Sequence, residues 1–394
     1  MKHYRRLIQP SISIPPPPIV LQERGNQLSI DRTGHGLYVP DHPYRLDTPY
    51  CAYGSIITSP PQPPLIEPIR HDLLKIYFEF IDPVFPLFHT PSFQTQNKLL
   101  LYAIYAVSSR WDMVETHEPR GWTYYQQAVH LLDRQEPVEL ATVQAVLLLL
   151  KYNEHVRRPG YMWRTRYYFS MALRMCQDLG LSRDLNLAFI EKESRKRVFW
   201  AIYCYDLMMS IEQGTLPQLK ETPIMIDLPI ALTDEASTKI QQWTLLIQII
   251  QHQAAILDYL RSKQENPQRH QQLSDQLTAT MKQINPPPSP SEDLCYAVCF
   301  LHLSSHFAVI LLHRAHLDIC YNSAVIIKEM VEWILACHAY EDMYCSIRGV
   351  QQVIHYLSAA FTIFKEKGTE EEASFTFQLI QKLASISPVI EMSM

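Results

Sequence analysis

The chain has 394 residues, of which 10 are Gly and 28 are Pro. Phosphate-binding loops, tight hairpins and nucleophile elbows all need glycine, so this composition argues against nucleotide-binding α/β enzymes and all-β folds and favours helices. A formal net charge of −5 excludes an attraction of the whole molecule for nucleic acid or anionic membrane. Any contact with DNA would have to be local.

The eight cysteines form no Cys-x-x-Cys pair and no dense framework. We therefore expect reduced, mostly buried thiols in an intracellular protein. No stretch reaches the roughly 18 uninterrupted apolar residues of a membrane-spanning helix, and the first residues carry no signal-peptide pattern. The sequence thus predicts a soluble protein that is not secreted and makes no membrane contact.

Proline dominates the start of the chain, where 13 of the 28 prolines lie within the first 70 residues. Because proline lacks the amide donor of a helix and restricts the residue before it, residues 1–64 are predicted to form a Pro-rich, extended and partly disordered arm. Within this arm, the segment from Leu28 to Val39 is apolar enough to pack as a short strand or loop.

From residue 65 almost to the end, apolar residues recur at three- and four-residue steps, which is the period of a helix. Residues 65–394 are therefore predicted to form a large all-α, multi-helix array. The helix at 191–213 is apolar on two faces, which places it inside the array. Asp82-Pro83 ends the first helix, and three or four helices are expected between residues 292 and 386. The other helices are expected at 95–109, 120–134, 139–155, 161–179 and 234–262.

Cys295, Cys299, His302 and His306 form the densest set of metal-ligand residue types. Their spacing places all four on one face of a single helix, where the first and last would lie about 16 Å apart. The ligands of one zinc ion must all lie within about 2.3 Å of it, so one helix cannot supply them. We interpret the set as a core face of small thiols and hydrogen-bonded imidazoles. A two-ligand subset completed by a neighbouring helix is the alternative.

Basic residues gather at two places in the sequence. The second set alternates with Glu191 and Glu193 in the first turn of the helix at 191–213. Interleaved charges of this kind are typical of a solvated helix turn with local ion pairs, and a nucleic-acid or localisation patch is the alternative. The two sets are Arg157, Arg158, Arg164 and Arg166, and Lys192, Arg195, Lys196 and Arg197.

The segment from Met171 to Asp184 has the pattern of a helix end followed by a turn. Gly180 falls where a left-handed C-terminal cap is needed, and Leu181 can make the apolar contact that accompanies such a cap. We therefore expect a positive φ angle at Gly180.

Several segments match one protein family in order and approximate spacing. They are Tyr77 to Phe93, Ala141 to Tyr152, Trp163, Ala172 to Asp184, Glu191 to Asp206 and, more weakly, Asp227 to Leu232 and Ile310 to Leu317 with His313 and Arg314. Together they resemble the middle homology region of fungal binuclear zinc cluster transcription factors, the xylanolytic-activator-like regulatory domain. The resemblance is specific over residues 65–230 and diffuse from there to about residue 320.

The chain also departs from the pattern of that family. Ser182 stands where the family usually has His in a Leu-Gly-Leu-His-Arg turn, Asp206-Leu207 replaces an Asp-Arg pair, and Gly214 to Pro217 replaces Gly-Arg-Pro. The DNA reader of the family needs six cysteines around two zinc ions, and only Cys51 lies ahead of the helical region. We therefore expect no zinc cluster in this chain, whether through truncation, gene-model loss or divergence.

The resemblance implies a transcription regulator that acts in the nucleus on a metabolic or biosynthetic gene set, with no enzymatic activity, no cofactor and no bound metal. Its partners would be other transcription factors or a DNA-bound partner, and its own DNA contact would be weak or indirect. The sequence leaves open a small-molecule effector and a dimer. The candidate regulatory or partner contacts are Trp163, Arg166, Arg195, Arg197 and Asp206.

A helical enzyme or ligand-binding protein of a biosynthetic pathway is the alternative function, since an apolar pocket between helices could hold a substrate. The aromatic residues Trp163, Tyr167, Tyr168 and Phe169 permit such a pocket, although rings of this kind are more typical of a core. A cytosolic scaffold is a third interpretation. The sequence carries none of the common nucleotide-binding, nucleophile-elbow or zinc-protease motifs, which disfavours the enzyme.

Overall fold

The computed structural model describes residues 69–389, except 115–118, 135–137, 263–265, 287–294 and 338, together with three strands near the N-terminus. The chain divides into two compact units, Met1–Pro60 and Pro61–Met394. In the first unit, the strands form an antiparallel sheet in the order β1-β2-β3. They are β1 (Val20–Glu23), β2 (Asn26–Ile30) and β3 (Gly36–Pro40).

Strands β2 and β3 overlap the segment from Leu28 to Val39, for which a short strand was one of two expectations. Leu28 lies between the other two strands, paired with Leu21 on one side and Tyr38 on the other. The remainder of the expected arm at 1–64, its predicted disorder and its boundary at residue 65 lie outside the described residues.

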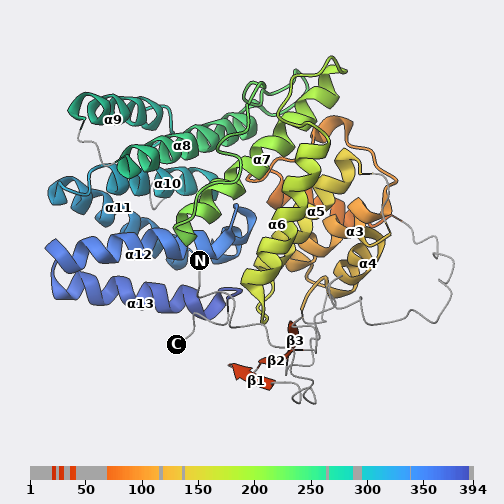
Figure 1. Cartoon of the computed structure of the whole chain (residues 1–394), viewed down its shortest axis with the longest axis horizontal. Coiled ribbons are helices and arrows are strands. Elements are labelled where there is room, and N and C mark those ends of the chain that lie inside the picture. The colour runs from red at the N-terminus through yellow and green to blue at the C-terminus, as the bar shows by residue number, and fades with distance from the viewer. Residues whose placement is uncertain are drawn as a thin grey trace, which may run out of the picture. The chain divides into compact units, whose positions relative to one another are not determined.

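The first half of the helical unit contains most of the helices that the periodicity predicts. α2 continues directly as a π-helical turn at Tyr77–Ile81, which ends at Asp82 as expected. Figure 1 shows α7 passing between the group α3 to α6 and the group α8 to α13. The helices are α2 (His71–Ile76), α3 (Lys98–Ser108), α4 (Trp122–Leu132), α5 (Leu140–His155), α6 (Tyr161–Asp178) and α7 (Phe189–Gln213).

The second half contains one helix that the periodicity does not predict, α9. This helix buries only Leu273, Leu277 and Thr280, so its apolar stripe is too narrow to stand out among polar residues. Asn266 caps its first turn and Pro267 occupies the first position. The helices are α8 (Ser237–Arg261), α9 (Pro267–Met281), α10 (Tyr296–Leu312), α11 (Leu317–Ala336), α12 (Gly349–Lys367) and α13 (Glu370–Ile386).

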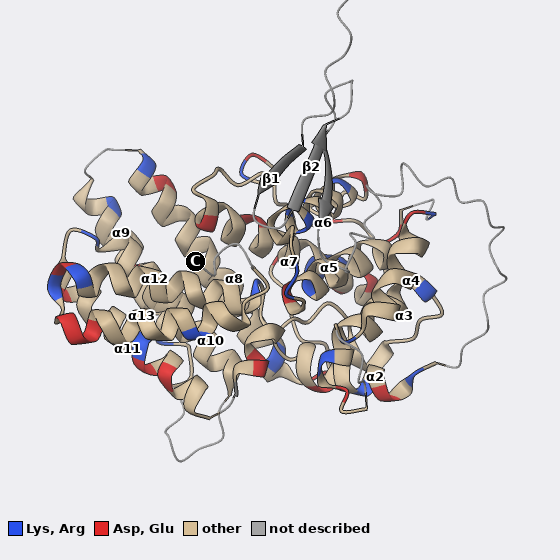
Figure 2. Cartoon of the chain, turned by 90° about the horizontal axis from the view of Figure 1, so that it is seen from below, with Lys and Arg blue, Asp and Glu red and all other residues tan. Residues whose placement is uncertain are grey.

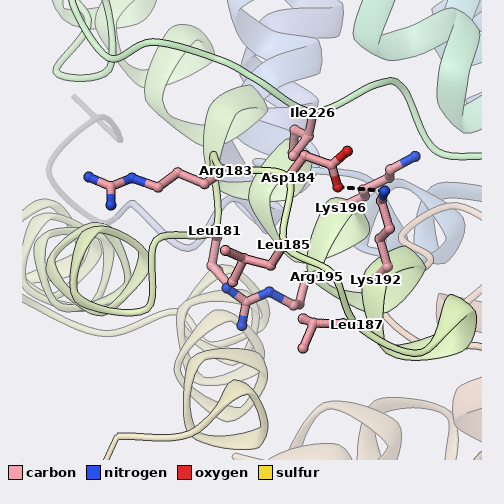
Figure 3. A pocket seen from close by; sticks show the side chains of 9 residues that line it. All are labelled: Leu181, Arg183, Asp184, Leu185, Leu187, Lys192, Arg195, Lys196 and Ile226. Carbon is pink, nitrogen blue, oxygen red and sulfur yellow. Dashed lines mark ion pairs between the residues drawn. The ribbon is translucent and has the colours of Figure 1, made fainter.

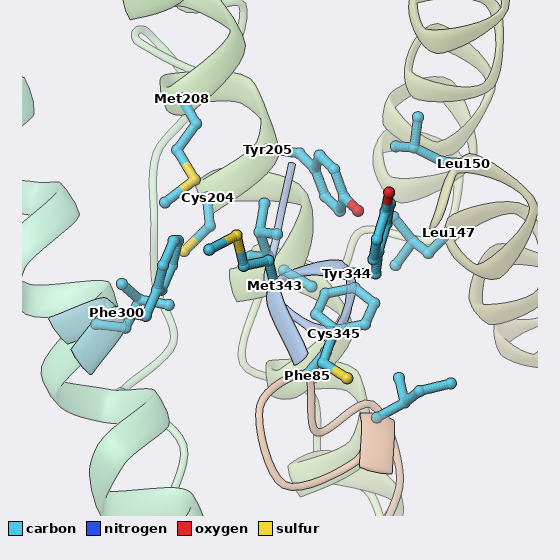
Figure 4. Packing of buried hydrophobic residues seen from close by; sticks show 14 of the residues in the cluster. Phe85, Leu147, Leu150, Cys204, Tyr205, Met208, Phe300, Met343, Tyr344 and Cys345 are labelled. Carbon is cyan, nitrogen blue, oxygen red and sulfur yellow. The ribbon is translucent and has the colours of Figure 1, made fainter. Parts of the chain in front are cut away.

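The core of the helical unit is centred on α5 and α7. Every residue of α5 from Thr142 to His155 is buried. Figure 4 shows residues of α5, α7 and α10 meeting the 3₁₀ turn at Ala339–Cys345, and the rings of Phe85 and Tyr205 lie edge to face with centroids 6.0 Å apart. The prediction of an all-helical array is confirmed over residues 69–389. Among the described residues, no helix combines the length and the apolarity that crossing a bilayer requires.

One cluster of charged side chains inside this core consists of Lys151, Glu154, Glu212 and Arg348. Figure 2 shows charged segments beside α5 and α7 as well as at the periphery. Arg348 forms two bonds to Glu212, of 3.0 and 2.5 Å, and Lys151 lies 2.7 Å from Glu154. Arg348 adopts a left-handed backbone with φ of +65°, a conformation that costs an ordinary residue about 1–3 kcal/mol. The bonds of its guanidinium therefore hold α5, α7 and α12 together against that cost.

Candidate functional site

The turn between α6 and α7 has the predicted left-handed cap. Gly180 has φ of +59°, and Leu181 is 1% exposed. The Leu181 amide donates to the Cys176 carbonyl at 3.0 Å and the Gly180 amide donates to Gln177 at 3.0 Å, which is the Schellman pattern. The expectation at Gly180 is therefore confirmed.

The segment after α7, residues 215–235, turns back along that helix, and we refer to it as the return segment. At its start, the Asp206 carboxylate accepts hydrogen bonds from the amides of Gln218 at 3.0 Å and Leu219 at 2.7 Å. Further along, the Trp200 indole donates to the Asp227 carbonyl at 3.0 Å. Side chains of α7 thus fix the path of a stretch that has no regular structure of its own.

Two further contacts hold the return segment to the start of α7. The Glu193 carboxylate accepts from the Ile230 amide at 2.9 Å. The amide of Met225 donates to the carbonyl of Ser182 at 2.9 Å, which joins the α6–α7 turn to the return segment. Ser182 stands where the family usually has His, and here it makes this contact through its backbone carbonyl and not through its side chain.

Arg197 is buried in an ion-pair cluster, which corrects the expectation of a solvated first turn. Its guanidinium bonds both oxygens of Glu235, at 2.8 and 2.6 Å, and lies 3.3 Å from Glu193. Arg197 is 0% exposed and Lys196 8% exposed, because the return segment covers this side of the helix. The expected local ion pairs are present, since Lys192 also pairs with Asp184 at 2.5 Å.

The burial of these charges changes their pKa values. Burial raises the pKa of Glu193, although Arg197 opposes the change. Burial acts in the same direction on Glu235, but the hydrogen bonds and charges of Arg197 and Lys239 outweigh it, so the pKa of Glu235 lies below its ordinary value. Glu235 is therefore held ionised beside Arg197, as a structural ion pair requires.

Arg195 lines a shallow depression between the α6–α7 turn and the return segment, which Figure 3 shows. One guanidinium nitrogen of Arg195 donates to the Leu179 carbonyl at 2.6 Å. The lining contains four cationic side chains and one carboxylate, and we refer to it as the basic depression. It consists of Leu181, Arg183, Asp184, Leu185, Leu187, Lys192, Arg195, Lys196 and Ile226.

Large apolar side chains are also exposed on the α6–α7 turn, on the first turn of α7 and on the return segment. We refer to these six residues as the apolar rim. Monomeric proteins expose single apolar residues routinely, and these six stand out because they lie on adjoining segments. The rim consists of Leu185 (40% exposed), Phe189 (63%), Ile190 (44%), Ile224 (38%), Met225 (67%) and Ile230 (47%).

Asp206 lines a second depression, of about 150 Å³, between α7, α8 and the return segment. Burial raises the pKa of its carboxyl group, and the amides of Gln218 and Leu219 oppose this change. Lys220 and Asp258 form an ion pair of 2.7 Å on the same wall. Because both oxygens of Asp206 are engaged by the backbone, its evident role is to position the return segment.

Trp163 and Arg166 lie toward the other end of α6, about 24 Å and about 20 Å along the helix from Leu179. Trp163 is 40% exposed and stacks on Tyr167, with ring centroids 5.4 Å apart, whereas Tyr168 and Phe169 are buried. The expectation of a core position is thus wrong for Trp163. Arg166 bonds the Gln213 side chain at 3.1 Å. The structure therefore distributes the five candidates over separate places.

The Cys/His set on α10 has mixed surroundings. Cys299 is buried but Cys295 is exposed. His302 donates to the Asn285 carbonyl at 2.9 Å, and His306 forms a hydrogen bond of 3.2 Å with Ser323. Within the described part of the chain, no group of three or more Cys, His, Asp and Glu residues is arranged to hold a metal ion.

The packing of the return segment against α7 and the exposure of its apolar residues were not predicted, although part of the segment, Asp227 to Leu232, matches the family weakly. The stretch from Glu221 to Leu232 is apolar and interrupted by proline, so it has neither a helical nor a strand period. The one feature of the sequence that could have indicated this surface is the presence of Ile224, Met225 and Ile230 in a segment that cannot form a core element. The partner of Arg197, Glu235, lies 38 residues away and has no local signal at all.

The fungal specific transcription factor domain matches residues 74–332, about two thirds of the chain. The chain belongs to this family. The resemblance seen in the sequence is thereby confirmed, and it extends beyond residue 230 through α8, α10 and most of α11. The family consists of transcription factor domains and not of enzymes, so the match argues against the alternative of a helical enzyme.

Three relatives illustrate the similarity. A transcriptional regulatory protein of Schizosaccharomyces pombe is 31% identical over 43% of this chain and 19% of its own length. A negative regulator of pleiotropic drug resistance of Candida glabrata is 28% identical over 28% of this chain and 11% of its own length. An ABC-transporter-regulating transcription factor of Aspergillus oryzae is 25% identical over 43% of this chain and 21% of its own length.

The matched stretch thus spans less than a quarter of each of these relatives. No solved structure matches the chain.

Proposed function

We propose that this chain controls transcription of a metabolic or biosynthetic gene set in the nucleus, through contacts between its helical array and another transcription factor or a DNA-bound partner. The family match over residues 74–332 carries this proposal. Two of the relatives bear names that describe regulation of drug resistance and of ABC transporters, which supports control of a gene set by this chain.

The distribution of charge supports contact with proteins rather than direct reading of DNA. The whole chain carries a formal net charge of −5. Two of the basic residues at the start of α7 are already engaged, Arg197 by Glu235 and Lys192 by Asp184. Specific DNA binding needs several cations to reach phosphates together with side chains that reach base edges, so we expect weak, sequence-independent DNA binding.

The mechanism that follows is one of surface presentation. Buried ion pairs fix α7 against α5 and α12 at one end and against the return segment at the other. A partner that binds the turn, the start of α7 or the return segment therefore contacts a stretch tied to the centre of the array. Its binding energy can shift the array between states only if those states differ in affinity for it.

A fusion experiment tests the proposed function. The full chain, joined to an unrelated DNA-binding module, should activate or repress a reporter that carries the site of that module. Trp200→Asp, which places a carboxylate at a 2% exposed position of α7, should abolish the effect by disrupting the fold, so abundance must be measured in parallel. An abundant nuclear fusion that leaves reporter output unchanged in a fungal host would contradict the proposal.

A further inference from the structure

The apolar rim and the basic depression belong to one stretch of surface because the same hydrogen bonds connect their segments. The Met225 amide bonds the α6–α7 turn at Ser182, and the Ile230 amide bonds α7 at Glu193. Rim residues on the turn, on α7 and on the return segment are therefore held close to the charged lining of the depression. Six of the thirteen exposed large apolar side chains among the described residues lie here.

We propose that the apolar rim and the basic depression together bind an acidic, amphipathic segment of a partner protein. The lining of the depression carries an excess of three positive charges, so electrostatic complementarity favours an acidic occupant. Phe189 and Met225, more than three fifths exposed, provide anchors that such a segment would cover with its apolar face.

Other occupants fit these features less well. Residues 1–64 of this chain contain six Lys and Arg against four Asp and Glu, so the arm has the same sign of charge as the depression. A nucleic acid would be attracted by the cations but has no counterpart for an apolar rim of six side chains. A partner segment that combines carboxylates with large apolar residues complements both features.

The inference rests on the proposed function in one respect, since it names the chemistry of the partner through which the chain would act. The two proposals fail separately. A fusion that regulates the reporter while the chain binds no acidic segment overturns only the present inference. A chain that binds the segment but leaves the reporter unchanged overturns only the proposed function.

Fluorescence anisotropy with the full chain tests the inference directly. The probe is a labelled peptide of about 15 residues, four helical turns, with Leu and Phe on one face and Asp and Glu on the other. A matched peptide carries Lys in place of every acidic residue. We expect the acidic peptide to bind at least about tenfold more tightly. Its affinity should fall as ionic strength rises from about 0.1 M to about 1 M, because screening then acts within about 3 Å.

Variants locate the binding surface. The double change Phe189→Ser and Met225→Ser should weaken binding of the acidic peptide by about tenfold or more, and Arg183→Glu should weaken it and reduce its salt dependence. The matched controls are Phe377→Ser, at a 46% exposed ring on α13, and Arg174→Glu, on the exposed side of α6. Both controls should bind as the parent chain does.

Four results would overturn the inference. Equal affinity for the acidic and basic peptides would remove the role of charge, and unchanged binding by the rim variants would place the site elsewhere. Displacement of the acidic peptide by a random-sequence DNA duplex that itself binds more tightly would assign the depression to nucleic acid. Self-association of the parent chain that the rim variants abolish would assign the rim to a second copy of this chain.

Discussion

Both ends of α7 carry buried ion pairs, but the N-terminal end also lies beside several cations that are exposed or half-buried. At the C-terminal end, Glu212 meets Arg348, and the neighbouring pair of Lys151 and Glu154 is fully enclosed. Near the N-terminal end, Arg183 is exposed and Arg195 is half-buried beside a depression with few carboxylates. Buried charges persist only when they are paired, whereas exposed ones remain accessible to a partner.

The comparison separates residues that hold the fold from residues that can bind. Arg197 and Asp206 lie close to the binding surface in the sequence, yet their functional groups are engaged by Glu235 and by the backbone of the return segment. Removing them would act on stability first. The rim residues have the opposite character, because their side chains contribute little to the core and much to the exposed surface.

The largest effect is predicted for a substitution at the C-terminal end of α7, where the charged side chains are enclosed. Arg348→Met removes the guanidinium from between Glu212 and Glu154, so that Glu212 loses its cation and Glu154 keeps only Lys151. We expect a loss of about 3–5 kcal/mol in the free energy of unfolding, measured by urea denaturation. The same change at Arg174, which is 76% exposed, should cost less than about 0.5 kcal/mol. Equal losses in the two variants would refute the distinction drawn between enclosed and exposed charges.

A smaller effect is expected at the turn that carries the basic depression. Gly180→Val forces a β-branched residue into the left-handed region, where only the Arg183 side chain lies near the new Cβ, at 3.6 Å. The cost is therefore one of backbone conformation, about 1–3 kcal/mol. Ser182→Ala should change stability by less than about 0.5 kcal/mol, because the contact of Ser182 with Met225 uses its carbonyl. Thermal unfolding of both variants checks this, and a stable Gly180→Val protein would show that the cap tolerates a side chain.

A third effect depends on pH and concerns His306 of α10. Burial lowers the pKa of His306 to about 4 from an ordinary 6.5. The unfolded chain therefore takes up this proton first, so acidification from pH 7 to pH 5 destabilises the fold through His306 by up to about 2 kcal/mol.

His306→Gln removes that contribution. Compared with the parent chain, the variant should gain stability steadily as the pH falls from about 7 to about 5, whatever its stability at neutral pH. Urea denaturation of both proteins at several pH values gives the difference. A difference that stays constant over this range would mean that His306 titrates alike in the folded and unfolded chains.

Much of the helical array could be predicted from the sequence because its signals are local. The leucine run of α5, the double apolar face of α7 and the glycine at position 180 each fix a structure within one or two turns of chain. The mostly polar α9 gave no such signal, since it buries only two leucines and one threonine.

The proposed binding surface was harder to predict because it depends on contacts distant in the sequence. Lys196 and Arg197 have the pattern of a solvated turn until residues 215–235 cover them. The rim is created by the same contacts, which bring Ile224 and Met225 beside the turn at Ser182. A single sequence contains the residues of this surface but not the hydrogen bonds that assemble it.

The central claim is that the enclosed charges hold the array while the apolar rim makes the contact that regulates transcription. Reporter output from the full-chain fusion, normalised to protein abundance, tests it most directly when the double variant Phe189→Ser and Met225→Ser is compared with Phe377→Ser. We predict that the rim variant folds with stability within about 0.5 kcal/mol of the parent and loses most of its effect on the reporter, while Phe377→Ser retains it. Equal reporter activity in the parent, the rim variant and the Phe377→Ser control would contradict the account.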